Sequence, residues 1–132
     1  MLDERFEVVR RVNEIPDRCK LIFWSSLATL SGSRPKPEEI IVANPGEPFQ
    51  ASDNIVPGLP FRRLEFAGLG TARCFLHYQS GGGPPSFCLA VIDYQNQKII
   101  WAGDYRYAAR DLDELRRWVL QQRFRDTLGR GC

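Results

Sequence analysis

The clearest hydrophobic pattern lies in residues 62–103, where runs of apolar, β-branched and aromatic residues are separated by short polar turns. The runs cover residues 62–67, 72–79, 86–93 and 98–103. The glycines and prolines of residues 80–85 end the two central runs, because neither residue type continues a strand well. Connections this short join only antiparallel neighbours. The pattern therefore predicts a four-stranded antiparallel meander.

A strand register follows if Gln79 faces Ser86 across the glycine turn. His77 then faces Cys88, and closing the preceding turn symmetrically places Arg62 beside His77. Both faces of the central strands are apolar, so we expect both to be covered at least in part. A slip of one residue would exchange the faces of one strand and separate Arg62, His77 and Cys88.

Two helices are expected to pack on this sheet. Residues 2–13 place apolar side chains at helical spacing, and residues 111–124 do the same behind Asp111, a suitable N-cap with Glu114 three positions later. Residues 19–30 are ambiguous. Their apolar run favours a buried strand, which we prefer, although the spacing of Phe23 and later leucines also fits a helix.

Residues 31–60 contain six of the nine prolines and are expected to wrap around the sheet, with one strand at residues 39–43. Residues 47–60 are long and polar for a simple connector. Long ordered loops often bind ligands, so this segment contains candidate contacts. The alternative is an irregular surface wrap held by proline rigidity. The candidates are Glu47, Gln50, Ser52, Asp53 and Asn54.

Length and composition fit one ordinary α+β domain over residues 1–132, with four to six strands and a flexible tail at residues 127–132. The net charge of +2 gives no strong field for nucleic acid or anionic lipid. The charged first residues and the short apolar runs favour a cytoplasmic protein that does not enter a membrane. Four cysteines without a C-x-x-C pair favour free thiols over disulfides.

The one catalytic arrangement to test is Cys88 with His77, in a thiol-dependent hydrolase or transferase. A thiol needs a base within about 3 Å to become a useful nucleophile. The structural alternative is a buried cysteine and a histidine that bonds to a loop. With a single histidine and no ligand cluster, no metal site and no cofactor is expected.

Among the possible partners, nucleic acid has the least support from the sequence. The arginines near the C-terminus are offset by carboxylates in the same segment, so a solvated helix face explains them better. The arginines in question are Arg116, Arg117, Arg123, Arg125 and Arg130.

The sequence therefore favours a non-enzymatic binding or interaction domain for an unknown small molecule or protein. The hypothesised surface is the sheet end nearest the glycine turn, bordered by residues 47–54. Self-association through an edge strand such as residues 62–67 is a further option. The candidate ligand contacts are Arg62, His77, Tyr78, Asp53 and Asn54.

Overall fold

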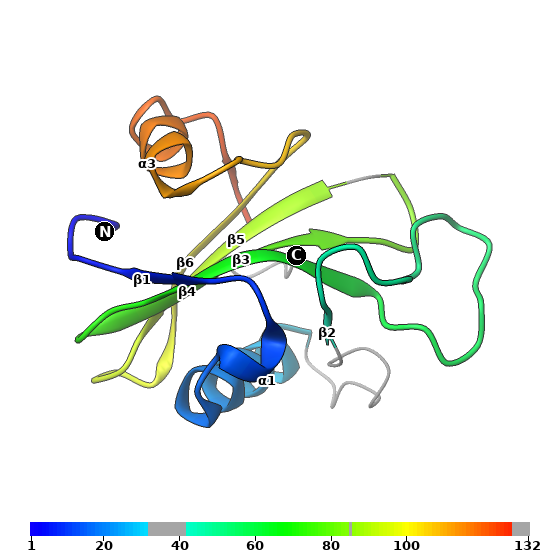
Figure 1. The fold of residues 1–132 in the computed structure, drawn as a ribbon, viewed down its shortest axis with the longest axis horizontal. Coiled ribbons are helices and arrows are strands. Elements are labelled where there is room, and N and C mark those ends of the chain that lie inside the picture. Colours follow the sequence, from blue (N-terminus) through cyan, green and yellow to red (C-terminus); the bar gives the residue numbers. More distant parts are fainter. Residues whose placement is uncertain (32–41, 85, 128–132) are drawn as a thin grey trace.

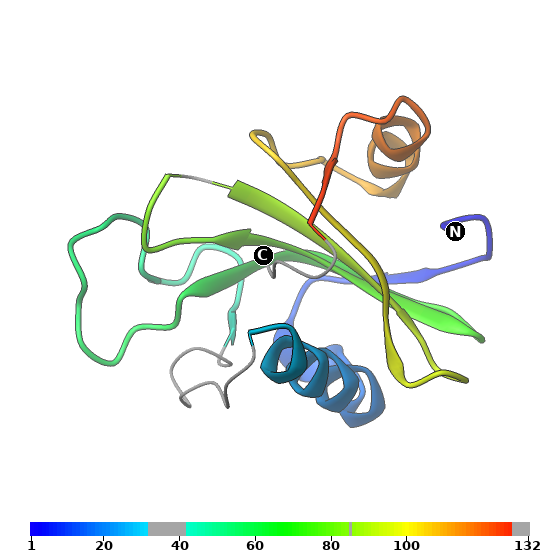
Figure 2. The same cartoon turned by 180° about the vertical axis from the view of Figure 1, so that it is seen from behind.

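The computed structural model describes residues 1–31, 42–84 and 86–127, and it confirms the predicted α+β class (Figure 1). Within these residues a seven-stranded sheet forms the middle layer. Helix α1 (Asp17–Ser31) covers one face and α3 (Leu112–Leu120) the other, as Figure 2 shows from behind. The strands are β1 (Glu7–Val9), β2 (Val42–Ala43), β3 (Arg62–Leu69), β4 (Arg73–Ser80), β5 (Ser86–Asp93), β6 (Lys98–Tyr105) and β7 (Arg125–Asp126).

The predicted meander is present as β3, β4, β5 and β6, each antiparallel to the next. Strand β1 and the parallel strand β2 both pair with β3, and β7 pairs with β6. On the side of β3 away from β4, β2 pairs with Arg62 and Arg63 and β1 pairs with residues 67–69, so β3 is not the outer strand of the sheet. This placement is a correction to the edge strand proposed for self-association.

The predicted register is wrong by one residue at the glycine turn. Ser80 is still part of β4 and pairs with Ser86, so Tyr78 faces Cys88 and His77 faces Leu89. The strand continues because the Gly81 N–H donates to the Phe61 carbonyl (2.8 Å), which extends the pairing with β3. On the other side Arg62 pairs with Ser80, not with His77.

The N-terminal elements also differ from the predicted ones. Residues 2–13 contain β1 and the 3-10 helix η1 (Val12–Glu14) instead of an α-helix. The first predicted helix fails because β1 gains backbone hydrogen bonds to β3, a partner far along the chain. Residues 19–30, assigned to a strand, belong to α1. An N-terminal helix is thus present, but it is α1, which follows β1 and η1 instead of starting the chain.

The sheet buries apolar side chains on both faces, as its central strands predicted. One cluster packs α1, through Cys19 and Phe23, against Leu76 and Ile92. The other packs α3, through Leu115, against Phe75 and its neighbours. Adjacent residues of β4 therefore enter different clusters, which is the period of two expected of a strand.

The C-terminal helix begins as predicted. The Asp111 carboxylate accepts the Glu114 N–H (2.9 Å) and caps α3, although the helix ends at Leu120, before Phe124. No helix in the described part of the chain is long and apolar enough to cross a membrane. The predicted flexible tail lies outside the described residues except for Thr127, which is buried.

Candidate functional site

His77 and Cys88 do not form the predicted pair. They are diagonal in the register and belong to opposite faces, since Cys88 packs in the α1 cluster while His77 packs against Phe66 and Phe124 on the α3 side. The separation follows from the one-residue register difference, because side chains alternate between the faces of a sheet.

His77 is a structural residue with both ring nitrogens occupied. The Ala109 N–H donates to Nε2 (3.0 Å), so Nδ1 carries the proton and donates to the Cys88 carbonyl (2.8 Å). Burial lowers the pKa of His77 to about 4, against the opposing effect of the bond to Cys88. The ring is therefore neutral near pH 7 and holds the chain before α3 against the sheet. This confirms the structural alternative, a histidine that bonds to a loop.

The described cysteines are not free thiols, contrary to expectation. Cys19 of α1 and Cys74 of β4 form a disulfide with a Cα–Cα distance of 6.4 Å. Cys88 is also disulfide-bonded, so none of the described cysteines has a free thiol. Spacing in the sequence could not reveal the Cys19 pair, because the two residues meet only when α1 packs on the sheet.

Arg62 and Tyr78 lie close together, but Tyr78 is buried beneath α1. Its ring packs edge-on against Phe23, with the ring centroids 5.3 Å apart. Burial raises the pKa of the Tyr78 hydroxyl to about 12, against the opposing effect of the nearby Arg62 guanidinium. Of the five predicted ligand contacts, His77 and Tyr78 are thus inaccessible, Arg62 is partly buried, and Asp53 and Asn54 are exposed.

The loop at residues 50–60 is organised by Gln50, which is only 2% exposed. Its side-chain NH2 donates to the carbonyls of Val56 and Leu59, and its Oε1 accepts the Val56 N–H (2.8 Å). The Gln50 N–H donates to the Pro60 carbonyl (2.8 Å), which closes the ends of the loop. These bonds make it an Ω-loop whose interior is filled by one amide side chain.

The glycine turn holds this loop from the other side. The Gly82 N–H donates to the Gln50 carbonyl (2.8 Å), and Gly82 has a positive φ of 82°. A Cβ on Gly81 would lie 1.7 Å from the same carbonyl oxygen, so only glycine permits this approach. We call the loop at residues 50–60 and the turn at residues 81–84 together the hairpin end.

The loop tip, residues 53–56, presents two polar and two apolar side chains to solvent. Ile55 is 54% exposed and Val56 is 51% exposed. Beside the tip is an open hollow of about 430 Å³. Its lining residues are Ala51, Ser52, Asp53, Gly83 and Pro84. The hollow joins the predicted loop to the predicted turn. The apolar pair was missed, although Ile55 and Val56 stand out in an otherwise polar segment.

The arginines near the C-terminus have partners within the molecule. Arg116 donates to the carbonyls of Leu2 and Glu4 at 2.8 Å each. Arg117 pairs with Glu114 (3.5 Å), Arg123 donates to Gln121 (2.7 Å) and Arg125 pairs with Asp104 (2.7 Å). Arg130 lies outside the described residues. This segment therefore presents no concentrated free positive stripe within the part that is described.

Among the described residues, no group of three or more His, Cys, Asp or Glu is placed to hold a metal ion. The fold and the hairpin end thus define an α+β domain with a presented loop. Comparisons with protein-family models, curated proteins and solved structures found no match.

Proposed function

We propose that this protein is a non-enzymatic binding domain whose partner, another protein, contacts the hairpin end. The observation that carries the proposal is the loop tip, where exposed Ile55 and Val56 stand on a base fixed by buried Gln50. A flexible loop would lose conformational entropy on binding. A loop already held by internal hydrogen bonds loses less, so more of the contact energy contributes to affinity.

A protein surface fits this site better than a small molecule. The hollow beside the tip is open, whereas small-molecule sites usually enclose most of the ligand. Adjacent exposed aliphatic side chains with Asp53 and Asn54 beside them resemble the mixture of apolar centre and polar rim found in protein interfaces.

The alternatives have less support. A thiol-dependent enzyme needs a free thiol and an available base, whereas Cys88 is disulfide-bonded and His77 uses both nitrogens. A nucleic-acid binder using the C-terminal arginines needs guanidinium groups that are not already engaged. Arg116 and Arg125 are bonded within the molecule.

The cellular compartment is also a proposal. The sequence favoured the cytoplasm, but the Cys19–Cys74 disulfide favours an oxidising compartment, because cytosolic thiols are usually kept reduced. The disulfide is the more direct observation, so we propose an oxidising compartment. The oxidation state of Cys19 and Cys74 in protein from its own cells distinguishes the two.

The functional proposal is tested by affinity capture from extracts of the cells that make this protein, followed by quantitative mass spectrometry. The wild type is compared with an Ile55→Ser, Val56→Ser double variant. A Leu21→Ser variant is the matched control, because Leu21 is 59% exposed on α1. We expect a protein captured by the wild type and the control but reduced at least about tenfold by the double variant.

Equal capture by all three proteins would contradict the proposal, because the loop tip would then make no contribution. Equal loss in the double variant and the Leu21 control would contradict it as well. Circular dichroism spectra of both variants verify that the fold is retained, so that any loss reflects the surface.

A further inference from the structure

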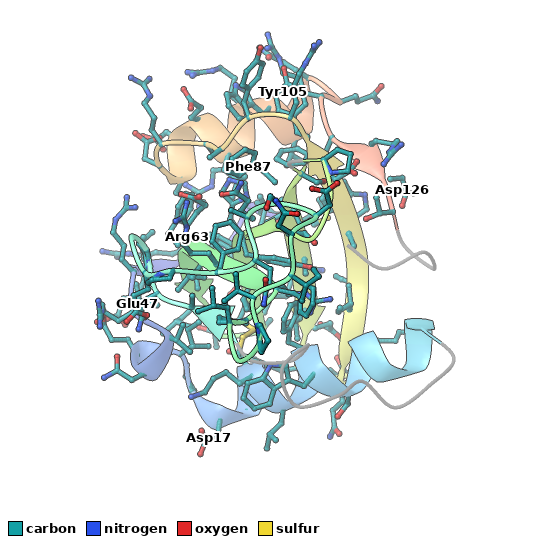
Figure 3. The ribbon with its side chains drawn as sticks, turned by 90° about the vertical axis from the view of Figure 1, so that its right-hand side faces the viewer. Asp17, Glu47, Arg63, Phe87, Tyr105 and Asp126 are labelled. Atoms are coloured by element: carbon teal, nitrogen blue, oxygen red, sulfur yellow. A yellow bond between two sulfur atoms is a disulfide. The ribbon has the colours of Figure 1, made fainter. Side chains whose placement is uncertain are left out.

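Next to the loop, one row of side chains crosses four strands on the α3 side of the sheet. Arg63 of β3 pairs with Gln79 of β4, Gln79 with Phe87 of β5, and Phe87 with Tyr105 of β6. All four are partly exposed. Figure 3 looks at this end and labels Arg63, Phe87 and Tyr105, which follow one another toward α3. We call these four residues the sheet-face row.

The Arg63 guanidinium is fixed by neutral groups. Its Cζ lies 4.4 Å from the centroid of the Phe49 ring, and its two Nη atoms donate to the Gln79 Oε1 (3.3 Å) and the Glu47 carbonyl (3.5 Å). No described ion pair includes Arg63, although its charge opposes the rise that burial causes in the pKa of the Glu65 carboxyl on the same strand. The nearby Glu47 carboxylate instead accepts the Asn44 N–H (2.7 Å). The row thus begins at an oriented positive charge that a ligand carboxylate can complement.

The other end of the row is aromatic. The Tyr105 ring packs edge-on against Trp118 of α3 (5.2 Å between centroids) and against Tyr107 (5.5 Å). Tyr107 is 56% exposed. Because these rings support one another, they offer a rigid apolar contact at little entropic cost.

We infer that the sheet-face row binds an extended peptide segment of the partner, with a carboxylate on Arg63 and an aromatic side chain against Tyr105 and Tyr107. This inference rests on the proposed binding function and names the chemical class of the partner. The segment crosses the strands over Gln79 and Phe87.

Strand spacing sets the separation of the two anchor side chains. Adjacent strands are about 4.8 Å apart, so Tyr105 lies about 14 Å from Arg63 across three intervals. An extended peptide advances about 3.4 Å per residue, and side chains four positions apart point the same way at about 14 Å. The inferred motif is therefore an acidic residue followed by an aromatic residue four positions later.

The charges beside the row favour this peptide over single-stranded nucleic acid. Nucleic acid places a phosphate at every step, whereas the row has Arg63 as its one cation, with Arg106 over the Tyr107 ring at the far end and the exposed carboxylates of Glu47 and Asp53 near the Arg63 end. A peptide with a single carboxylate can pair with Arg63, and it brings no further negative charge to this surface.

The test is fluorescence anisotropy with a labelled peptide, Gly-Ser-Glu-Ser-Thr-Ser-Phe-Ser-Gly, and with peptides in which Glu is replaced by Gln or Phe by Ser. We expect the parent peptide to bind with a dissociation constant below about 1 mM and each substitution to weaken binding at least about fivefold. An oligothymidine of similar length tests the nucleic-acid alternative. Binding of the oligonucleotide without the peptide would overturn the inference.

Protein variants locate the site. Arg63→Gln should weaken peptide binding at least about tenfold, and Arg63→Lys should restore part of it. Arg18→Gln is the matched control, because Arg18 also lies over an aromatic ring, 4.0 Å from the Tyr94 centroid, and belongs to α1. Equal effects of Arg63→Gln and Arg18→Gln would contradict the inference.

The absence of peptide binding would also contradict it. If capture of the partner still depends on Ile55 and Val56, the proposed function stands and only the peptide class is wrong. If peptide binding is normal but capture is indifferent to the loop tip, the failure lies in the loop-tip proposal.

Discussion

Two buried polar side chains, His77 and Gln50, decide which residues of the candidate site are available. His77 bonds to the backbone of Cys88 and Ala109, and Gln50 bonds to the backbone of its own loop, so these atoms stabilise the fold and are not available to a ligand. Residue type alone makes Gln50 a candidate contact. Burial cannot be read from residue type in an irregular loop, where Asp53 and Asn54 are exposed and Gln50 is buried.

The neutral state of His77 makes stability depend on pH. Its pKa is about 4 in the folded protein and about 6.5 when unfolded, so the unfolded chain binds the proton more readily. Stability from His77 is therefore present above pH 6.5 and is lost as the pH falls toward 4. We predict that the free energy of unfolding falls by about 3 kcal/mol from this residue between pH 7 and pH 4.

Urea unfolding of the wild type and of His77→Gln across this pH range measures the effect. Glutamine keeps a donor and an acceptor but has no titrating ring. The variant should lose less stability on acidification, since the remaining loss comes from carboxylates in both proteins. Parallel pH curves for the two proteins would show that His77 is not held neutral.

At the scale of elements, composition located the meander strands but not their register. Glycine and proline clusters mark the turns, whereas Ser80 could belong to either turn or strand. Irregular pairing between Leu64 and Phe66, and between Val91 and Ile92, shifts the register further. Each shift reverses the faces beyond it, so the sheet-face row could not be derived from the sequence.

The N-terminal elements show a second limit. The apolar spacing of residues 2–13 fits one face of a helix, but their side chains meet different parts of the sheet. Phe6 packs on Phe75 while Val9 enters the α1 cluster. Contacts of this kind join segments far apart in sequence, and local periodicity does not contain them.

The disulfide between α1 and β4 leads to a prediction at the same scale. Cys19 and Cys74 are separated by 55 positions, and closing a loop of that length in the unfolded chain stabilises the folded state by about 4 kcal/mol. In protein from its own cells, denatured in the presence of iodoacetamide so that buried thiols are accessible, both residues should be unmodified. Reduction should then lower the free energy of unfolding by at least about that amount in urea titrations, because the disulfide of Cys88 is broken as well.

Alkylation of both Cys19 and Cys74 in that experiment would favour a reducing compartment and the cytoplasmic alternative. An unchanged urea midpoint after complete reduction would show that the disulfide does not stabilise the folded protein. The two readouts are independent, since one reports the compartment and the other reports the fold.

Across the whole molecule, the two helices cover the sheet on opposite faces and the hairpin end extends beyond both of them (Figures 1 and 2). The loop at residues 50–60, the glycine turn and the sheet-face row all lie at this end. The glycine turn holds the loop at residues 50–60 against the sheet. Apolar, aromatic and charged groups therefore lie on one side of the protein.

The most direct test of binding at the hairpin end is photocrosslinking in the cells that make the protein. A photoreactive phenylalanine analogue is placed at position 55 in one variant and at position 21 in another, since Ile55 and Leu21 have similar exposed fractions of 54% and 59%. We predict one discrete adduct from position 55 and none from position 21. The same adduct at both positions, or an adduct at position 21 alone, would contradict a partner site at the hairpin end.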